Sequence, residues 1–328
     1  MAYTLSRTLA PWLALAGILL APAAVADTAA GYPERPVKLA LPFPPGGSAD
    51  TITRSMAERL QAQLHQPFLI ENRPGAAGNV ATRYIAKAPA DGYNLLVGVT
   101  GAMAINPNLY TLDYDPAKDF VAVSMVARAP VVVVADPQAG IGSIKQLIEQ
   151  AKARPGMLTY ATNGVGTSHH LAAELFRQAA GLDMRNVPYK GTPEALQDII
   201  GGRVPLGFMD LTASIPLIAS GKLKALATTG TRRSPALPDV PTVAEAGVPG
   251  FAADTWVGIF APKGTPQAIV EKLSAEMKTA LALPELRARA QTQGLEVAGS
   301  TPAELQRFLQ EESAKWKRVV SEAGIKLQ

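Results

Sequence analysis

Two glycine-rich segments carry the residues best suited to chemistry, and each comes directly before a predicted helix. Residues 42–50 read PFPPGGSAD, and residues 162–170 read TNGVGTSHH. Unpaired backbone amides at a helix N-terminus attract anions, and glycine lets the backbone come close to a ligand. Both segments therefore indicate a site for an oxyanion, with an ordinary tight turn as the alternative for the first. We expect no cofactor, because neither segment matches a Walker A loop or a dinucleotide-binding fingerprint.

The second segment also raises a catalytic alternative. A hydrolase would use Ser168 as nucleophile with His169 or His170 as its base. The Gly-x-Ser-x-Gly turn that exposes such a serine is absent. Adjacent residues on a helix point about 100° apart, so the two histidines cannot face one site together. We therefore expect no catalytic residue and no metal ligand here, and assign these side chains to packing, capping or the wall of a pocket.

Three further places could contribute to an anion site. Residues 72–79, NRPGAAGN, form another glycine-rich loop before a helix, which we interpret as structural. Thr100, Gly101 and Ala102 follow a predicted strand, and their small side chains let backbone amides reach a ligand. Asp210 ends another predicted strand, where it can receive an ammonium group or cap the next helix.

Alternating strands and helices must position these segments. Strands are predicted at 37–41, 68–71, 95–100, 158–161, 186–189 and 206–209, and helical patterns follow them at 48–64, 79–88, 102–106, 167–180, 193–200 and 213–220. This alternation favours an α/β fold with largely parallel sheets. In such sheets ligands bind outside the carboxyl ends of the strands, where the loops described above lie.

Two crossings divide the chain into two domains. Apolar runs at 121–127 and 131–135 are separated only by Arg128-Ala129-Pro130, and both have the pattern of long strands. A proline-rich stretch before the strand-like run 254–261 marks a second crossing near residue 250. We therefore expect one domain of residues 27–128 plus 252–328 and another of residues 129–251. Helices are predicted from Pro266 to about 281 and from about 301 to 323.

The composition excludes several classes of protein. The 328 residues contain no cysteine, which rules out disulfides, a thiolate nucleophile, iron–sulfur clusters and cysteine-ligated zinc. Lys and Arg number 31 against 27 Asp and Glu, giving a formal charge of +4 without a basic run of five. We therefore expect no nucleic-acid partner.

The first residues have the pattern of an export signal. Arg7 precedes an apolar stretch from Leu9 to Leu20, and the segment ends in Ala24-Val25-Ala26. This pattern predicts a secretory signal peptide at 1–26, cleaved after Ala26 to release a periplasmic protein. The alternative is a transmembrane anchor, but two prolines interrupt a run shorter than the ~20 residues that span a bilayer.

Motifs along the whole mature chain resemble the solute-binding proteins of tripartite tricarboxylate transporters, also called the Bordetella uptake gene (Bug) family. These motifs are YPERPV at 32–37, PFPPGGSAD at 42–50, ENRPGAAG at 71–78, APADGY at 88–93, VPYKG at 187–191, LPDVPT at 237–242, EAG at 245–247 and APKGTP at 261–266. The resemblance implies a two-lobed, type II-like periplasmic binding fold. Each lobe would hold a mixed, mostly parallel sheet flanked by helices, with two crossovers between the lobes.

The same resemblance implies a binding site in the cleft between the lobes. One wall would be formed by Phe43, Gly46, Gly47, Ser48 and Asp50, with Thr100, Gly101 and Ala102 on the same lobe; Thr162, Gly166, Thr167 and Ser168 would lie opposite, with Asp210 recognising the far end of the ligand. Main-chain amides and ordered water would hold the ligand carboxylate.

We therefore expect a monomer that captures a small organic anion and delivers it to the membrane subunits of a transporter. The lobes would close on the ligand, and the permease would recognise the closed form. Two alternatives remain open: a periplasmic serine hydrolase that uses Ser168 with one of the histidines, and a ligand-loaded sensor that docks on a receptor kinase. The shared motifs do not identify the acid.

Overall fold

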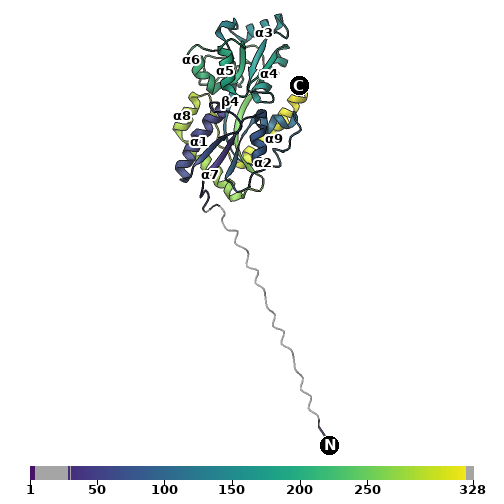
Figure 1. The fold of residues 1–328 in the computed structure, drawn as a ribbon, viewed down its shortest axis with the longest axis vertical. Helices are drawn as coiled ribbons and strands as arrows, with labels where there is room; N and C mark the ends of the chain where they lie inside the picture. Colours follow the sequence, from purple (N-terminus) through teal and green to yellow (C-terminus); the bar gives the residue numbers. More distant parts are fainter. Residues whose placement is uncertain (4–28, 30, 323–328) are drawn as a thin grey trace.

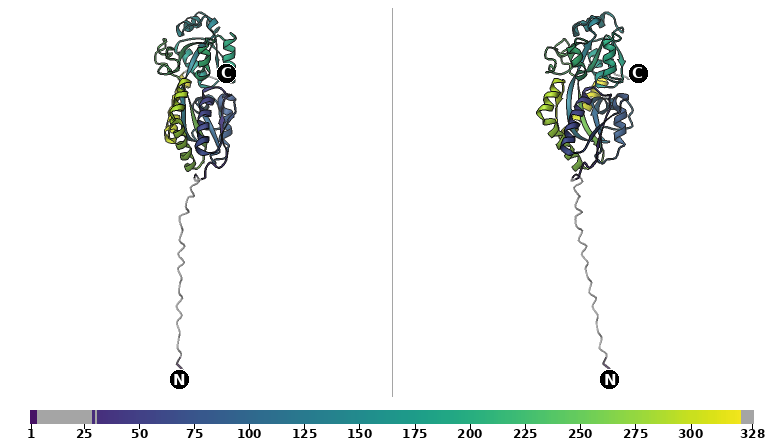
Figure 2. Two further views of the ribbon diagram at one scale, coloured as in Figure 1. Left: turned by 90° about the vertical axis from the view of Figure 1, so that its left-hand side faces the viewer. Right: turned by 60° about the vertical axis from the view of Figure 1, so that its left-hand side comes forward.

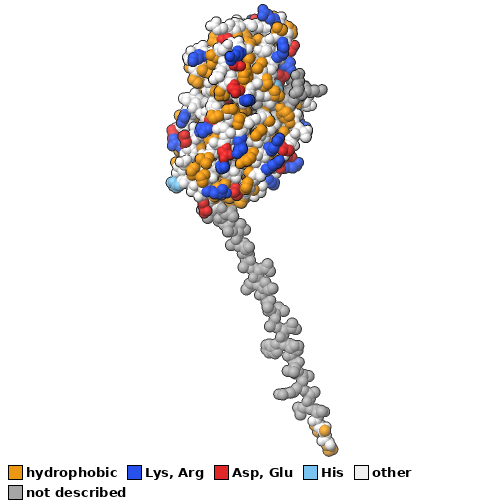
Figure 3. Space-filling view, viewed as in Figure 1, with side chains coloured by type: hydrophobic (Ala, Val, Ile, Leu, Met, Phe, Trp, Pro, Cys, Tyr) orange, Lys and Arg blue, Asp and Glu red, His pale blue; other side chains and the backbone are white. Residues whose placement is uncertain are grey.

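The computed structural model describes residues 1–3, 29 and 31–322. The predicted signal peptide falls almost wholly outside these residues. Among them, no helix is long and apolar enough to cross a membrane. On the face shown in Figure 3, basic and acidic side chains are interspersed, as the small net charge leads one to expect.

Lobe 1 contains the first three strands and the end of the chain (Figure 1). Strand β1 (Val37–Leu41) pairs in parallel with β2 (Phe68–Asn72) and β3 (Asn94–Val99), and β9 (Asp254–Pro262) lies antiparallel between β3 and β4 (Phe120–Ala135). The short β10 (Glu296–Val297) pairs with β4. The helices of this lobe are α1 (Ser48–Leu64), α2 (Asn79–Ala86), α7 (Gln267–Ala282), α8 (Pro284–Thr292) and α9 (Pro302–Glu322).

Lobe 2 contains the middle of the chain and forms the upper part of Figure 1. Strand β5 (Thr159–Thr162) pairs in parallel with β6 (Arg185–Pro188) and β7 (Leu206–Asp210), whereas β7 and β8 (Lys224–Thr228) pair with β4 in antiparallel fashion. The helices are α3 (Ile144–Ala153), α4 (Ser168–Ala179), α5 (Thr192–Ile200) and α6 (Leu211–Ala219). The predicted α/β fold, with a mixed sheet flanked by helices in each lobe, is confirmed.

Strand β4 connects the two lobes, and Figure 2 shows it running from one into the other. The prediction of separate strands at 121–127 and 131–135 is wrong, because the strand continues through Pro130. Pro130 has no N–H to donate, and it stands where β4 exchanges its partner β9 for β7 and β8. The next amide, of Val131, donates to the hydroxyl of Thr229 instead of to a strand. The missing N–H of Pro130 therefore lies at the point where β4 changes its hydrogen-bonding partner.

Apolar side chains fill both faces of each sheet. In lobe 2, the buried rings of Tyr160 and Phe176 contact Phe208, with ring centroids 5.9 and 5.7 Å away. In lobe 1, α9 packs against the sheet through the buried Trp316, whose indole donates to Glu312. The sequence patterns predict α9 from its apolar spacing but do not predict α3, α8, β8 or β10.

Replacing Phe208 tests the core of lobe 2. We expect Phe208→Ala to lower the free energy of unfolding by about 3–5 kcal/mol, because the cavity left between two rings cannot collapse fully. Urea denaturation followed by circular dichroism measures the change. Leu69→Ala is the control, since Leu69 is 45% exposed, and it should change stability by less than about 0.5 kcal/mol. Equal effects of the two variants would contradict this view of the core.

Candidate functional site

A cavity lies between the two lobes. Its space measures about 690 Å³, including open solvent at the mouth. Residues of both lobes and of both connecting strands line it: Phe43, Pro44, Gly47, Ser48, Ala49, Asp50, Val99, Gly101, Ala127, Arg128, Ala129, Asn163, Thr167, Ser168, His169, Gly191, Thr192, Pro193, Asp210, Thr255, Trp256, Val257 and Leu295. The two glycine-rich segments therefore form opposite walls of the same cavity.

Eight of the predicted site residues line this cavity: Phe43, Gly47, Ser48, Asp50, Gly101, Thr167, Ser168 and Asp210. The other five do not line it: Gly46 is exposed, and the remaining four, Thr100, Ala102, Thr162 and Gly166, are buried. The Thr100 hydroxyl accepts the backbone N–H of Trp256 at 2.9 Å, and the Thr162 hydroxyl donates to Asn186 at 2.8 Å. These two side chains hold wall segments in place.

Helix α1 begins at the cleft, and its first amide is bonded across it. Gly47 is the N-cap residue and has no side chain to cap the helix. Instead the N–H of Ser48 donates to the Asp210 carboxylate at 3.0 Å, and the Ser48 hydroxyl donates to the same group at 2.6 Å. A carboxylate from lobe 2 therefore caps the first turn of α1. Asp210 also caps α6 by accepting the N–H of Ala213.

Asp50 stabilises the first turn of α1 from within lobe 1. Its carboxylate accepts two hydrogen bonds from Arg54, at 2.8 and 2.9 Å, and one each from Asn72 and the N–H of Gly46. Burial opposes ionisation of Asp50, but these bonds outweigh it, so the pKa of Asp50 lies below its ordinary value. The carboxylate is therefore a paired, ionised support of the loop.

Helix α4 begins at the opposite side of the cavity. Thr167 is its N-cap: the hydroxyl accepts the N–H of His170 and donates to the Gly164 carbonyl. Gly164 and Gly166 have φ values of +114° and +82°, which only glycine adopts without strain. A Cβ on Gly166 would also lie 2.6 Å from the side-chain oxygen of Asn106. This loop therefore requires its glycines.

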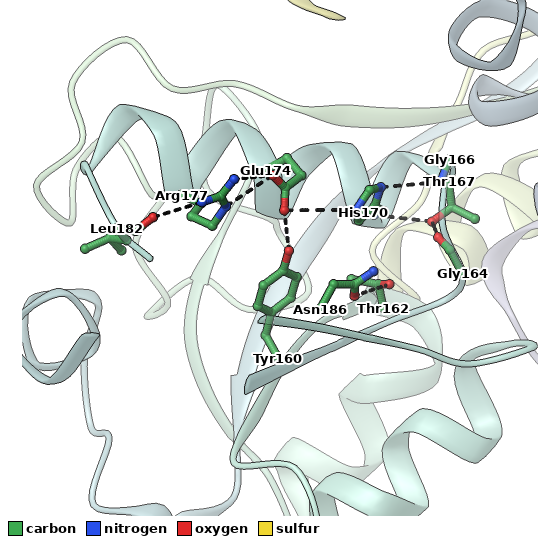
Figure 4. Close-up of polar contacts among 10 residues, drawn as sticks. All are labelled: Tyr160, Thr162, Gly164, Gly166, Thr167, His170, Glu174, Arg177, Leu182 and Asn186. Atoms are coloured by element: carbon green, nitrogen blue, oxygen red, sulfur yellow. Dashed lines mark hydrogen bonds and ion pairs between the residues drawn. The ribbon is translucent and has the colours of Figure 1, made fainter. Parts of the chain in front are cut away.

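The two histidines face different surroundings, as the helical geometry predicts. His169 lines the cavity. His170 turns toward the loop, where its Nδ1 accepts the N–H of Gly166 at 3.3 Å, and toward Glu174 on the next turn (Figure 4). Burial lowers the pKa of both imidazoles. His170 therefore acts as a neutral acceptor that fixes the loop.

A polar network continues from His170 along α4. The carboxylate of Glu174 accepts from the Tyr160 hydroxyl at 2.5 Å and from Arg177, and Arg177 also donates to the carbonyl of Leu182 (Figure 4). Burial disfavours the charged carboxylate, yet these donors hold the pKa of Glu174 below its ordinary value. These contacts hold α4 against β5, and the N-terminus of α4 lies at the cavity.

The hydrolase alternative requires a base in contact with the hydroxyl of Ser168. Among the described residues, the Ser168 hydroxyl makes no hydrogen bond to either imidazole. The described part of the chain also contains no group of three or more acidic or histidine residues that could hold a metal ion.

Sequence reasoning missed several residues of the wall. Asn163 stands within the second glycine-rich segment, beside residues that were selected for their amides and hydroxyls. Arg128 was visible as the one charge between the two apolar runs of the crossing. Thr192 and Trp256 come from a helix start and a connecting strand, and only the folded chain brings them to the cavity.

These features define a two-lobed α/β protein with a cavity between its lobes. Residues 52–325 match the model of the tripartite tricarboxylate transporter family receptor, and the chain belongs to this family. It is 39% identical to the protein BugT of Bordetella pertussis over 320 residues, which cover 96% of this chain and 98% of BugT. The resemblance to the Bug family is therefore confirmed.

Solved structures show the same fold. A structure of R. palustris Rpa4515 with adipate is 39% identical, has a TM-score of 0.87 and covers 90% of this chain and 99% of that one. A structure of MatC from Rhodopseudomonas palustris with bound malate is 34% identical, has a TM-score of 0.83 and covers 88% of this chain and all of that one.

The supported carboxylate of Asp50 predicts a specific pH dependence. Since its pKa is lowered by folding, its contribution is complete above the ordinary value near ~4 and is lost as the pH falls through the lowered value. We expect Asp50→Asn to cost about 1–3 kcal/mol of unfolding free energy at pH 7 and progressively less below about pH 4. Urea titrations at several pH values measure the difference. The exposed Glu58→Gln on the same helix is the control, and a pH-independent loss in Asp50→Asn would refute the assignment.

Proposed function

We propose that the protein is an extracytoplasmic solute-binding protein that captures a small organic anion between its lobes and delivers it to a membrane transporter. One observation carries this proposal. Ala49 and Asp50 of α1, and Ser168 and His169 of α4, all line the cavity, and their backbone N–H groups find no acceptor among the described residues. Two helix N-termini on opposite lobes thus offer free amides to one anion.

The ligands of the two similar solved structures support a carboxylate. Adipate and malate are both small dicarboxylates, and the proteins that bind them share the fold of this chain over most of its length. A carboxylate has several lone pairs and can accept amides from both walls at once. We therefore assign the cavity to an organic acid, with the free amides as its main donors.

Hinge motion follows from the way the lobes are joined. The chain passes from one lobe to the other along β4 at Pro130 and returns at the start of β9 near Asp254. We propose lobes of residues 27–128 plus 252–328 and of residues 129–251, which close on the ligand and open by bending at these strands. The proposed export signal at 1–26, cleaved after Ala26, places the mature protein in the periplasm, where membrane subunits of a tripartite transporter would receive the closed form.

Thermal unfolding of the mature chain against a panel of acids tests capture. The panel contains mono-, di- and tricarboxylates, amino acids and aromatic acids, with the corresponding amides as controls. At 1,000 times its Kd, a ligand should add about 4 kcal/mol and raise the melting temperature by several degrees. A shift by an acid that its amide does not reproduce supports anion capture. If no acid shifts a chain that was first unfolded and refolded to remove bound ligand, the proposal fails.

A close approach of the two lobes at Gly101 gives a test of closure. A Cβ on Gly101 would lie 3.1 Å from the carbonyl oxygen of Gly166 and 3.4 Å from the Cα of Thr167, both in lobe 2. We expect Gly101→Val to hold the lobes apart and to weaken ligand binding by at least about tenfold, the equivalent of 1.4 kcal/mol. Isothermal titration calorimetry measures the affinity, and small-angle scattering with ligand shows whether the variant stays open. Val80→Ala on the exposed surface of lobe 1 is the control, and unchanged affinity in Gly101→Val would exclude closure at this point.

A further inference from the structure

Asp210 places a negative charge in the cavity that the protein does not neutralise. Its side chain is buried, and its donors are the backbone and hydroxyl of Ser48 and the N–H of Ala213, all of them uncharged. Within the described part of the chain, no Lys or Arg forms an ion pair with Asp210. The N-termini of α1 and α6 stabilise this carboxylate, but a buried carboxylate without a basic partner still favours a cation beside it in the cavity.

The nearest titratable group does not supply that cation. His169 lies close enough for the charge of Asp210 to act on it, but burial outweighs that effect and lowers the pKa of the imidazole. Burial therefore favours the neutral form of His169. Asp50, the other carboxylate of the lining, already has Arg54 as its partner.

Asn163 presents a second unused acceptor on the same wall. Only 6% of the residue is exposed, and its Nδ2 donates to the Thr192 hydroxyl at 2.8 Å and lies 3.4 Å from a ring nitrogen of His169. Its Oδ1 is fully buried and has no hydrogen-bond partner among the described residues. An unpaired buried acceptor costs free energy until a donor reaches it.

An unpaired cation lines the same cavity. The Arg128 guanidinium lies over the ring of Phe308, with Cζ 4.3 Å from the ring centroid. Among the residues that the structure describes, it forms no ion pair with a carboxylate. The lining thus contains the carboxylate of Asp210 and the partly solvated guanidinium of Arg128, whose charge also acts on the nearby Asp254.

We propose that the ligand is a zwitterion, an amino carboxylate whose ammonium group is received by Asp210 and Asn163. An ammonium group carries a positive charge for Asp210 and further N–H donors for the unpaired Oδ1 of Asn163. The ligand carboxylate then accepts hydrogen bonds from the free amides and is attracted by the positive charge of Arg128. This assignment rests on the proposed capture of an organic acid and specifies the class of acid.

Matched ligands test the substrate class. For each carbon skeleton, the 2-amino, 2-hydroxy and unsubstituted acids are compared by calorimetry: aspartate, malate and succinate; glutamate, 2-hydroxyglutarate and glutarate; leucine, 2-hydroxy-4-methylpentanoate and 4-methylpentanoate. On the skeleton that binds best, we expect the amino acid to bind at least about tenfold more tightly than both analogues. Equal or tighter binding of a hydroxy or unsubstituted acid overturns the inference and leaves anion capture intact. If none of the nine acids binds, the inference fails, and the broader panel of acids decides whether anion capture fails as well.

Two substitutions of Asn163 with opposite expected effects test its role in binding the ammonium group. Asn163→Leu removes the acceptor and should lower the ratio of affinities for the amino acid and its unsubstituted analogue, whereas Asn163→Asp adds a charge and should raise that ratio. Asp210→Asn should also lower it, and the exposed Asp239→Asn in the same lobe is the charge-matched control. A purely structural role would weaken both ligands equally. A ratio unchanged in both Asn163 variants therefore refutes the assignment of Asn163.

Discussion

The hydrogen-bonded ladder of β4 is the constraint on which the rest of the molecule depends. Residues 120–130 of this strand pair with β9 in lobe 1, and residues 131–135 pair with β7 and β8 in lobe 2. One strand therefore belongs to the cores of both lobes, and its position fixes where α1 and α4 begin. Without this shared strand, the two sheets would not hold the free amides of both helices at the same cavity.

Local patterns predicted the elements that local physics controls. The pattern after the glycine turn predicted the observed bounds of α1, and Thr301 and Glu304 form a reciprocal cap at the predicted start of α9. The strand break expected at Pro130 was wrong, because a proline is tolerated where a ladder changes partners. The unpredicted β8 is a short strand, partly exposed at its start, and its apolar alternation is too brief to stand out.

The binding site was less predictable than the fold, because its decisive contacts are remote in sequence. Glycine-rich loops identified both walls of the cavity. The bond from Ser48 to Asp210, however, joins residues 162 positions apart, and no spacing rule relates them. The pairing of charges is also hard to predict: Asp50 forms an ion pair with its helical neighbour Arg54, whereas Asp210 forms no ion pair among the described residues. Only the three-dimensional arrangement separates a paired carboxylate from an unpaired one.

Under the proposed hinge motion, the cap that lobe 2 supplies to α1 would couple the stability of a helix to the population of open and closed states. When the lobes separate, the first turn of α1 loses Asp210, and a lost N-cap costs about 1 kcal/mol. That amount changes an equilibrium constant about fivefold, so this bond would shift the empty protein toward the closed arrangement by this factor relative to a protein without it. Apparent affinity scales with the fraction of molecules that are in the binding-competent state. With this bond in place, a smaller part of the ligand's binding free energy is therefore consumed in closing the lobes.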